Sequence, residues 1–301
     1  MKKVLITGAS GFVGENLNSY LIQRGYKTCG ISLRKDNWQT SLKLEGDVLI
    51  HLAGKAHDTA NISSEEEYFK VNRDLTVQLF KLFLESNVKD FLFFSSVKAI
   101  ADSVMGTLYE DTPANPQTPY GKSKYEAEEF ILSQKLPQGK RLFIIRPCMI
   151  HGPGNKGNLN LLYKVVKMGV PWPLGAFENQ RSFLSVENLS FLVTEIIGSS
   201  GIASGIYNFS DDDSLSTNDL VDLMSGALNT KTKIWNISPV LINLLVRIGD
   251  ILSLPLNSER LKKLTESYVV SNVKIKEALG VESLPISIKQ GLVNTIKSFK
   301  K

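Results

Sequence analysis

A glycine-rich turn at the start of the chain constrains its fold most strongly. Lys2–Thr7 is a short apolar run typical of a buried strand, and Phe12–Leu21 is typical of the helix that follows. Glycines at such a turn permit its tight bend, the close approach of a pyrophosphate and the packing of helix on strand. Free N–H groups and the helix dipole also favour a phosphate there. The order of strand, turn and helix predicts a dinucleotide site formed by Gly8, Ser10, Gly11, Phe12, Val13 and Gly14.

The first half of the chain alternates strand-like and helix-like segments. The expected strands are Lys3–Thr7, Thr28–Leu33, Val48–Leu52, Phe91–Ser95 and Leu142–Arg146. The expected helices are Gly14–Arg24, Glu65–Ser86 and Pro119–Gln134. This alternation is typical of an α/β protein with a Rossmann-type, doubly wound parallel sheet covered on both faces.

The pattern changes after about residue 150. Glycine and proline become frequent, Phe183–Phe209 is typical of one more helix–strand unit, and Ser210–Lys301 is mostly helical. We therefore expect residues 1–150 with 183–209 to form a Rossmann domain. Residues 151–182 with 210–301 would form a smaller, mostly helical substrate domain.

Composition and charge limit the class of protein. The 301 residues are 43% hydrophobic and 22% charged, which is ordinary for a globular protein. The net charge of +5 is scattered, which argues against a nucleic-acid partner and is compatible with a small anionic substrate. Only three apolar residues, Val4–Ile6, follow the N-terminal lysines, too few for a secretory signal, so we expect a cytoplasmic location.

Three further features point to packing. The apolar segment 240–256 predicts an amphipathic helix rather than a membrane span, packed through Leu241, Leu244, Leu245, Ile248 and Leu252. Cys29 and Cys148, 119 positions apart, are expected to be buried small residues. His51 is expected in the core, and His57 and His151 stand in loops without ligands at metal-binding spacing, so no metal site is expected.

Three polar residues at expected strand and helix ends form a candidate catalytic group. Ser96 follows the strand at 91–95, and Tyr120 and Lys124 share one face of the helix that starts at Pro119. A neighbouring ammonium favours the phenolate, so we expect a lowered pKa for Tyr120. Such a group can hold a carbonyl or alcohol oxygen and exchange its proton while hydride moves.

The chain resembles the extended short-chain dehydrogenase/reductase family, which includes nucleotide-sugar epimerases and dehydratases. The resemblance covers essentially the whole length. It rests on the glycine turn, His51–Gly54, Val71–Asn72, Ser95–Ser96, Tyr120–Lys124, Arg146–Pro147 with Gly152–Gly154, and Arg181–Phe183.

The resemblance implies an NAD(P)-dependent enzyme whose C-terminal domain binds the diphosphate of a nucleotide sugar. Tyr120 would be the acid/base, Lys124 its orienting cation and Ser96 the second hydrogen-bond partner. Asn72 would be a polar group near the nicotinamide. It also implies cofactor contacts from Leu52, Ala53, Gly54 and Pro147, together with Tyr120 and Lys124.

The end of the second strand bears on the choice of cofactor. Many NAD-preferring members carry an aspartate there for the adenosine ribose, whereas this chain reads Gly30-Ile31-Ser32-Leu33-Arg34-Lys35. No carboxylate repels a 2′-phosphate, and Arg34 and Lys35 are placed to bind one. Ser32 and Arg34 are therefore expected cofactor contacts, with NADP(H) favoured and NAD(H) as the alternative.

The residues around Ser96 bear on the chemistry. The 4,6-dehydratases of the family carry an Asp-Glu pair after the catalytic serine or threonine, whereas Val97-Lys98 stand here, which argues against dehydration. Ser95–Lys98, Asn158 and Asn179–Phe183 are similar to a subgroup of bacterial 4-ketoreductases. That subgroup acts on UDP-2-acetamido-2,6-dideoxy-4-keto sugars in surface-polysaccharide synthesis.

This similarity predicts a bound UDP-sugar whose C4 ketone is reduced. Arg181 is expected to bind the diphosphate through its bidentate geometry. Lys98, Asn158 and Arg260 are further candidates for substrate contact. A UDP-glucose or UDP-N-acetylglucosamine 4-epimerase remains the alternative, because epimerases share much of the pattern. A homodimer is also left open.

Overall fold

The computed structural model describes residues 1–34, 37–55, 64–155, 157–251 and 257–299. Its centre is a six-stranded parallel sheet in the order β2-β1-β3-β4-β6-β9. The strands are β1 (Lys3–Thr7), β2 (Lys27–Ile31), β3 (Val48–His51), β4 (Asp90–Phe94), β6 (Arg141–Pro147) and β9 (Gly205–Phe209). The predicted doubly wound Rossmann-type sheet is thereby confirmed.

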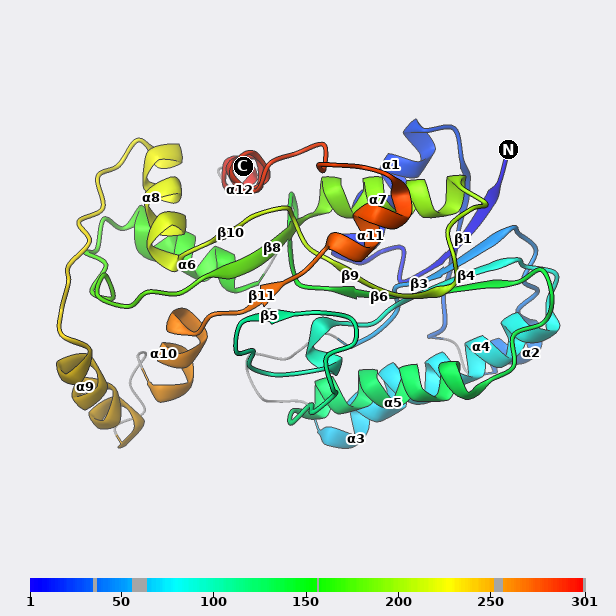
Figure 1. Ribbon diagram of the computed structural model, residues 1–301, viewed down its shortest axis with the longest axis horizontal. Helices are drawn as coiled ribbons and strands as arrows, with labels where there is room; N and C mark the ends of the chain where they lie inside the picture. The colour runs from blue at the N-terminus through cyan, green and yellow to red at the C-terminus, as the bar shows by residue number, and fades with distance from the viewer. Residues whose placement is uncertain (35–36, 56–63, 156, 252–256, 300–301) are drawn as a thin grey trace.

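Helices cover both faces of this sheet (Figure 1). One face carries α1 (Phe12–Gln23), α7 (Val186–Gly198) and α11 (Val273–Leu279). The other carries α2 (Trp38–Ser41), α4 (Leu75–Glu85) and α5 (Pro119–Ser133), with the short α3 (Glu65–Tyr68) at their end. The inner strands β1, β3, β4 and β6 are therefore closed off from solvent on both sides, as their apolar residues require, whereas the edge strand β2 is largely exposed.

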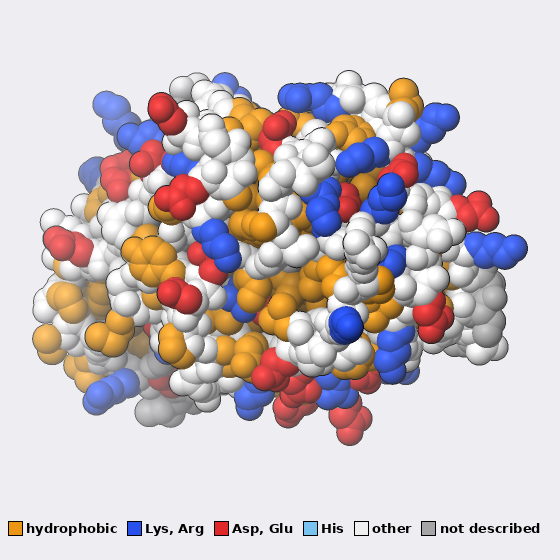
Figure 2. Space-filling view, turned by 45° about the vertical axis from the view of Figure 1, so that its right-hand side comes forward, with side chains coloured by type: hydrophobic (Ala, Val, Ile, Leu, Met, Phe, Trp, Pro, Cys, Tyr) orange, Lys and Arg blue, Asp and Glu red, His pale blue; other side chains and the backbone are white. Residues whose placement is uncertain are grey.

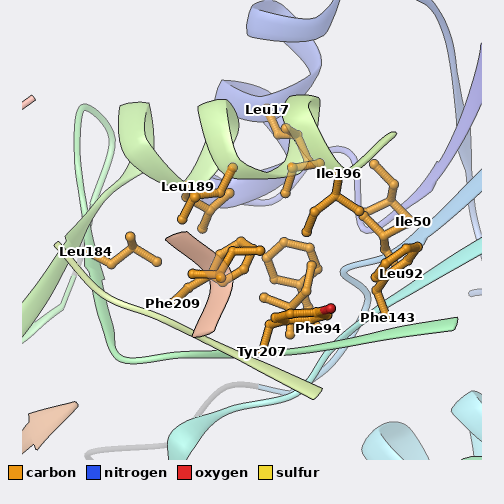
Figure 3. Packing of buried hydrophobic residues seen from close by; sticks show 14 of the residues in the cluster. Leu17, Ile50, Leu92, Phe94, Phe143, Leu184, Leu189, Ile196, Tyr207 and Phe209 are labelled. Carbon is orange, nitrogen blue, oxygen red and sulfur yellow. The ribbon is translucent and has the colours of Figure 1, made fainter. Parts of the chain in front are cut away.

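The core lies in the two layers between helices and sheet. Figure 3 shows Leu17 of α1 and Leu189 and Ile196 of α7 above Ile50, Leu92 and Phe143 of the sheet. A second layer under α4 and α5 contains Leu79, Phe80, Phe83, Phe91 and Phe93. All of these side chains are buried.

The rest of the chain forms a smaller unit beside the carboxyl ends of the strands (Figure 1). It holds a three-stranded sheet of β10 (Ser214–Leu215), β8 (Arg181–Ser185) and β7 (Met149–His151). Its helices are α6 (Asn158–Lys167), α8 (Thr217–Leu228), α9 (Pro239–Ile251), α10 (Ser258–Thr265) and α12 (Ile288–Ser298). A two-stranded sheet joins β5 (Thr107–Leu108) to β11 (Val269–Val270), so late and middle parts of the chain meet.

Several expectations need correction at the level of single elements. The second strand ends at Ile31, two residues earlier than expected, and the unit expected at 183–209 begins with an additional strand, β8, that pairs in the small sheet. The expected helix 65–86 is present but contains a π-helical stretch, η1 (Phe69–Asp74). Cys29 is exposed, because β2 is the edge strand, whereas Cys148 is buried as expected.

Helix α9 is amphipathic as expected, but its buried side was predicted wrongly. Leu241, Leu244, Leu245 and Ile248 are exposed, whereas Ile242 and Val246 are buried. Leu252 and His57 lie outside the described residues. None of the helices in the described part of the chain has the length and apolar character that a membrane span needs.

Candidate active site

The glycine turn after β1 forms a tightly closed cradle. Gly8 has a φ of +70°, and a Cβ atom there would lie 2.7 Å from the backbone nitrogen of Ala53. A Cβ on Gly14 would lie 2.3 Å from the carbonyl oxygen of Gly8. Gly11 is the residue directly before α1, and no side chain caps the amides at the start of this helix. The turn therefore brings free N–H groups at the helix start into the position expected for a pyrophosphate.

The other residues of the turn lie as that role requires. Ser10 and Gly11 are exposed, whereas Phe12 and Val13 are half-buried. Asn16 donates hydrogen bonds from Nδ2 to the carbonyl oxygens of Phe12, at 2.8 Å, and Pro153, at 3.1 Å. These bonds tie the start of α1 to the segment after β7.

The end of β2 carries Ser32 and Arg34, and both are exposed. Arg34 lines a cavity of about 1070 Å³ together with Asn37, Lys70 and Arg73, among others. The lining includes none of Ser96, Tyr120 and Lys124, so this cavity is separate from the candidate catalytic group. Lys35 lies outside the described residues.

A chain of hydrogen bonds through His51 connects the carboxyl ends of β1 and β3 with η1 and α4. Thr7 Oγ1 lies 2.6 Å from His51 Nδ1, and His51 Nε2 lies 2.9 Å from Thr76 Oγ1. The Thr76 hydroxyl donates to the Asn72 carbonyl oxygen, at 2.7 Å, and Thr7 Oγ1 accepts from Ala53 N, at 3.2 Å.

Each hydroxyl has only one proton to donate, and this determines which group is the donor in each of these hydrogen bonds. The single hydroxyl proton of Thr76 goes to Asn72, so His51 Nε2 must carry a proton and donate it to Thr76. Nδ1 then accepts from the Thr7 hydroxyl. Burial, with the nearby charge of Lys124, lowers the pKa of His51 to about 3, so the ring is neutral at ordinary pH.

Asn72 is held by the π-helical stretch η1. Its Oδ1 accepts from Lys55 N at 2.8 Å, and its Nδ2 donates to Lys55 O and to Ser123 Oγ, each at 3.1 Å. The Ser123 hydroxyl donates in turn to the Tyr120 carbonyl oxygen, at 2.9 Å. A π-turn inside an α-helix frequently marks a functional site. Here it joins the 51–55 turn to the helix of Tyr120.

Ser96, Tyr120 and Lys124 come together at the carboxyl end of β4. Ser96 ends the turn after β4 and accepts from Lys98 N at 3.2 Å, at the start of the short η2 helix (Val97–Ala99). Its side chain forms a hydrogen bond with Tyr120. Lys124 is buried and donates from Nζ to Phe94 O at 2.9 Å.

Two local features bring the Ser96 turn against α5. Thr118 caps α5 by accepting from Gly121 N, at 3.2 Å, and Asp102 accepts from the Thr118 N–H, at 3.1 Å. A Cβ on Gly121 would lie 2.4 Å from the Lys98 carbonyl oxygen, so only a glycine permits this approach. Asp102 and Gly121 were not predicted as site residues.

Leu52, Ala53 and Gly54 form the turn that faces this group. A Cβ on Gly54 would lie 3.0 Å from Asn72 Oδ1 and 3.1 Å from Lys124 Nζ. A side chain at position 54 would therefore crowd both polar groups. Pro147 ends β6 and is buried.

The pKa shifts differ from the expectation for Tyr120. Burial raises the pKa of Tyr120 above 10, and the Ser96 hydrogen bond offsets only part of this rise. The expected lowering by Lys124 is wrong for this structure, because burial dominates and the nearby Tyr68 raises the pKa of Tyr120 further. Burial also lowers the pKa of Lys124, to about 8. Both groups are thus shifted towards their neutral forms.

Lys98 and Arg181 place two cations beside the candidate catalytic group. Lys98 Nζ donates to the Asp102 carbonyl oxygen at 2.6 Å and lies 4.3 Å from the ring centre of Tyr268. Arg181 Nη1 donates to the Lys263 carbonyl oxygen. Burial lowers the pKa of both, and the charge of Arg181 acts on Lys98. Within the described ranges neither forms a salt bridge, so their charges remain available to an anion.

The remaining expected substrate residues lie on two helices. Asn158 is the first residue of α6, and its side chain is not described. Arg260 is exposed near the start of α10. Asn179 of the subgroup pattern is structural, because its side chain bonds to the backbone and hydroxyl of Thr217 and to the carbonyl oxygens of Leu264 and Glu266.

Tyr268 was not predicted, and it joins the late part of the chain to the Ser96 turn. Its hydroxyl lies 2.7 Å from the Ala101 carbonyl oxygen and 3.2 Å from that of Val97. Burial raises the pKa of Tyr268, so the hydroxyl stays a donor. No local pattern in the sequence marks this contact, since 167 positions separate Tyr268 from Ala101.

His151 has a structural role, although a carboxylate lies near it. His151 is buried in β7, with Nδ1 2.9 Å from Thr295 Oγ1 and Nε2 3.7 Å from Asp211 Oδ2. The sequence spacing did not reveal this carboxylate. In the described part of the chain, no three His, Cys, Asp or Glu side chains gather as metal ligands would.

The sequence is similar to proteins of a known family. The model of the NAD dependent epimerase/dehydratase family matches residues 4–209. The UDP-glucose 4-epimerase of Vibrio cholerae is 30% identical, covering 99% of this chain and 95% of its own. The N-acetyl-alpha-D-glucosaminyl-diphospho-ditrans,octacis-undecaprenol 4-epimerase of Escherichia coli O157:H7 is 28% identical over 98% of this chain and 94% of its own.

Solved structures show the same fold. RMD from Pseudomonas aeruginosa, complexed with NADPH, superposes with a TM-score of 0.77 at 20% identity, covering 100% of this chain and 99% of that one. MoeE5 in complex with UDP-glucuronic acid and NAD superposes with a TM-score of 0.76 at 19% identity, covering 99% of both chains.

Proposed function

The chain belongs to the NAD dependent epimerase/dehydratase family, and we propose that it reduces the C4 ketone of a UDP-2-acetamido-2,6-dideoxy-4-keto-hexose with NAD(P)H in bacterial surface-polysaccharide synthesis. The observation that carries this proposal is the joint placement of Ser96, Tyr120 and Lys124 at the end of β4. A hydroxyl, a phenol and an ammonium there suit an oxygen that gains a proton as hydride arrives at its carbon.

The residues of the turn fit a dinucleotide. The cradle between Gly8, Gly14 and Ala53 has no room for a Cβ atom, which matches close backbone contact with a pyrophosphate. NAD(P)H bound there would supply the hydride. Gly8–Gly14 would bind the phosphates, and Gly54, Asn72 and Lys124 would orient the nicotinamide end.

The protonation state of Tyr120 favours the reductive direction. A ketone that becomes an alcohol needs a proton donor, and burial keeps the Tyr120 phenol protonated at neutral pH. Ser96 would hold the ketone oxygen next to that phenol. Oxidation of an alcohol, the first step of a 4-epimerase, would need the phenolate instead.

Lys98 and Arg181 support an anionic substrate. They lie on the side of Ser96 that faces the smaller unit, without a carboxylate in salt-bridge distance among the described residues. A diphosphate would compensate both charges. We therefore propose that residues 1–150 and 183–209 bind the cofactor and that residues 151–182 and 210–301 bind the nucleotide sugar, in the cytoplasm and as a monomer or a homodimer.

NADP(H) is the proposed cofactor. Ser32 and Arg34 follow β2 in solvent-exposed positions, and no carboxylate stands between Gly30 and Arg34. The 2′-phosphate of NADPH would gain an exposed guanidinium rather than meet a negative charge.

A UDP-sugar 4-epimerase is the second candidate. The named activities of the relatives from Vibrio cholerae and Escherichia coli favour it, since both are 4-epimerases and match nearly the whole chain. Under this alternative the same Tyr120 would first take and then return the proton.

One assay distinguishes the two activities. The enzyme is mixed with NADPH and a UDP-4-keto-6-deoxy-N-acetylhexosamine, and NADPH absorbance and sugar products are measured. A reductase consumes one NADPH per sugar. Conversion of UDP-glucose or UDP-N-acetylglucosamine to its C4 epimer without added reductant would establish the epimerase instead.

A further inference from the structure

Helix α9 exposes apolar side chains along one whole side. Val240, Leu241, Leu244, Leu245 and Ile248 are exposed, with exposed fractions from 44% at Ile248 to 80% at Val240. Trp235, shortly before the helix, is 50% exposed. Orange side chains gather at the lower left of Figure 2, on the side of the molecule where α9 lies in Figure 1.

The helix has two apolar sides, of which only one packs on the protein. At about 100° per residue, the exposed apolar residues span an arc of roughly 140°. The buried Ile242 and Val246 lie on the next arc, and they belong to the core cluster that contains Leu261 of α10. Asn243, Arg247 and Asp250 occupy the rest. A helix that is already anchored thus presents a second apolar side to solvent.

The segment that contains α9 has an excess of basic residues, although two of them, Lys262 and Lys263, form ion pairs with Glu266 and Glu259 within or next to α10. Residues 230–266 contain six basic and three acidic residues, although the chain as a whole has a net charge of only +5. Asp250 is engaged in capping, because it accepts from the Ser258 N–H at 2.8 Å. Arg247 lies next to the exposed apolar arc on the same helix. The charges therefore favour an anionic partner.

We propose that α9 seats the protein on the surface of a membrane containing anionic lipid. An amphipathic helix lies in the interface with its apolar side among the acyl chains and its basic residues at the headgroups, and tryptophan favours the same zone. A second copy of this chain fits less well, since its α9 side would bring the same excess of positive charge. The surface defined by Val240, Leu241, Leu244, Leu245, Ile248 and Trp235 is called the α9 surface below.

The α9 surface adjoins the site described above. Helix α9 packs on α10, and the Lys263 carbonyl oxygen at the end of α10 accepts the hydrogen bond from Arg181. Attachment through α9 would hold Lys98 and Arg181, the residues proposed to bind the diphosphate, on the side of the site nearest the headgroups. The proposal does not depend on the sugar chemistry, so its test needs no substrate.

Co-sedimentation with vesicles tests the proposal. The full chain is mixed with vesicles of phosphatidylcholine alone or with 30% phosphatidylglycerol, and the bound fraction is measured. We expect binding to the anionic vesicles that is at least about tenfold stronger than to neutral ones. Leu244→Asp should weaken it at least about tenfold, because a charge replaces an inserted leucine.

A matched variant controls for the added charge. Leu132→Asp changes a leucine of similar exposure, 51% against 57% for Leu244, at the end of α5. It should bind vesicles as the unmodified chain does. Because both leucines are exposed, both variants should keep the thermal midpoint and the affinity for NADPH. Leu244→Trp should bind vesicles at least as strongly as the unmodified chain, in contrast to Leu244→Asp.

Three results would overturn the proposal. The unmodified chain fails to sediment with anionic vesicles, or Leu244→Asp and Leu132→Asp bind equally, or light scattering shows a dimer that only Leu244→Asp dissociates. The last result would assign the α9 surface to a second copy of the chain. None of them bears on the reductase assay, which uses a water-soluble UDP-sugar.

Discussion

The hydroxyl of Thr7 donates a hydrogen bond to Nδ1 of His51 over 2.6 Å, at the point where the paired strands β1 and β3 both end. His51 Nε2 donates a hydrogen bond to the Thr76 hydroxyl, and that hydroxyl donates to the carbonyl oxygen of Asn72. One neutral ring thus links the strand that leads into the glycine turn to the π-helical stretch.

Because His51 is buried and neutral, the free energy of unfolding should depend on pH in the acidic range. Its pKa is about 3 in the folded chain and about 6.5 when unfolded, so the unfolded chain binds one more proton between these values. The contribution is fully present above pH 6.5 and is lost as pH falls towards 3, at about 1.4 kcal/mol per pH unit. Urea unfolding at several pH values should show this slope to be smaller in His51→Gln. Equal slopes in both proteins would contradict the assignment.

Tyr120→Phe tests the proton donor. The ring and its packing are kept while the proton is lost, so turnover should fall at least about a hundredfold. Binding of NADPH, measured by fluorescence, should remain. Ser96→Ala is the companion variant and should have a smaller effect, because Ser96 only holds the oxygen. Near-normal turnover in Tyr120→Phe would exclude Tyr120 as the acid.

The pH profile of reduction reports on Lys124. Its pKa of about 8 means that the ammonium is present below pH 8 and is lost above it. If the ammonium orients the cofactor and the nearby phenol, kcat/KM for the keto sugar should be level below pH 8. It should then fall about tenfold per pH unit above it. Lys124→Met should be slow at every pH. A profile that stays level to pH 9.5 would show that the charge is not required.

Arg34→Ala tests the choice of cofactor. If the guanidinium pairs with the 2′-phosphate, the variant should bind NADPH about ten- to a hundredfold more weakly and NADH almost unchanged. Arg24→Ala is a suitable control, because Arg24 follows α1 and contacts Tyr20 of the same helix. Titration of both cofactors into each variant gives the ratio. Equal losses for NADPH and NADH would remove Arg34 from the cofactor site.

The sequence predicted those parts of the site that local spacing encodes. A glycine triplet between strand and helix, and a tyrosine and a lysine one helical turn apart, carry their geometry within a few residues. The alternation of strands and helices likewise gives the parallel sheet. Residues that come into contact only through tertiary structure have no local spacing pattern by which the sequence could reveal them. Thr7, His51 and Thr76 share one hydrogen-bond chain across 69 positions, and Tyr268 reaches Ala101 across 167.

Two errors have a common physical cause. The pKa of Tyr120 depends mainly on how far the folded chain withdraws the phenol from water, and this burial raises it. For α9 the apolar periodicity gave an amphipathic helix but not the side that packs, because both of its apolar sides satisfy the pattern. Burial is a property of the assembled fold, so residue spacing alone does not determine it.

The π-helical stretch Phe69–Asp74 makes the length of this segment critical, in contrast to the loops around it. A π-turn accommodates one residue more than the α-helix between the same ends. Deleting one residue would let α3 and α4 join as one regular helix between the same ends, but the residues inside the stretch would then change their positions around the helix axis. The Asn72 amide would then leave Lys55 and Ser123. Homologous chains that share this site should therefore show no single-residue gaps in the segment, even where the helix itself would become more regular.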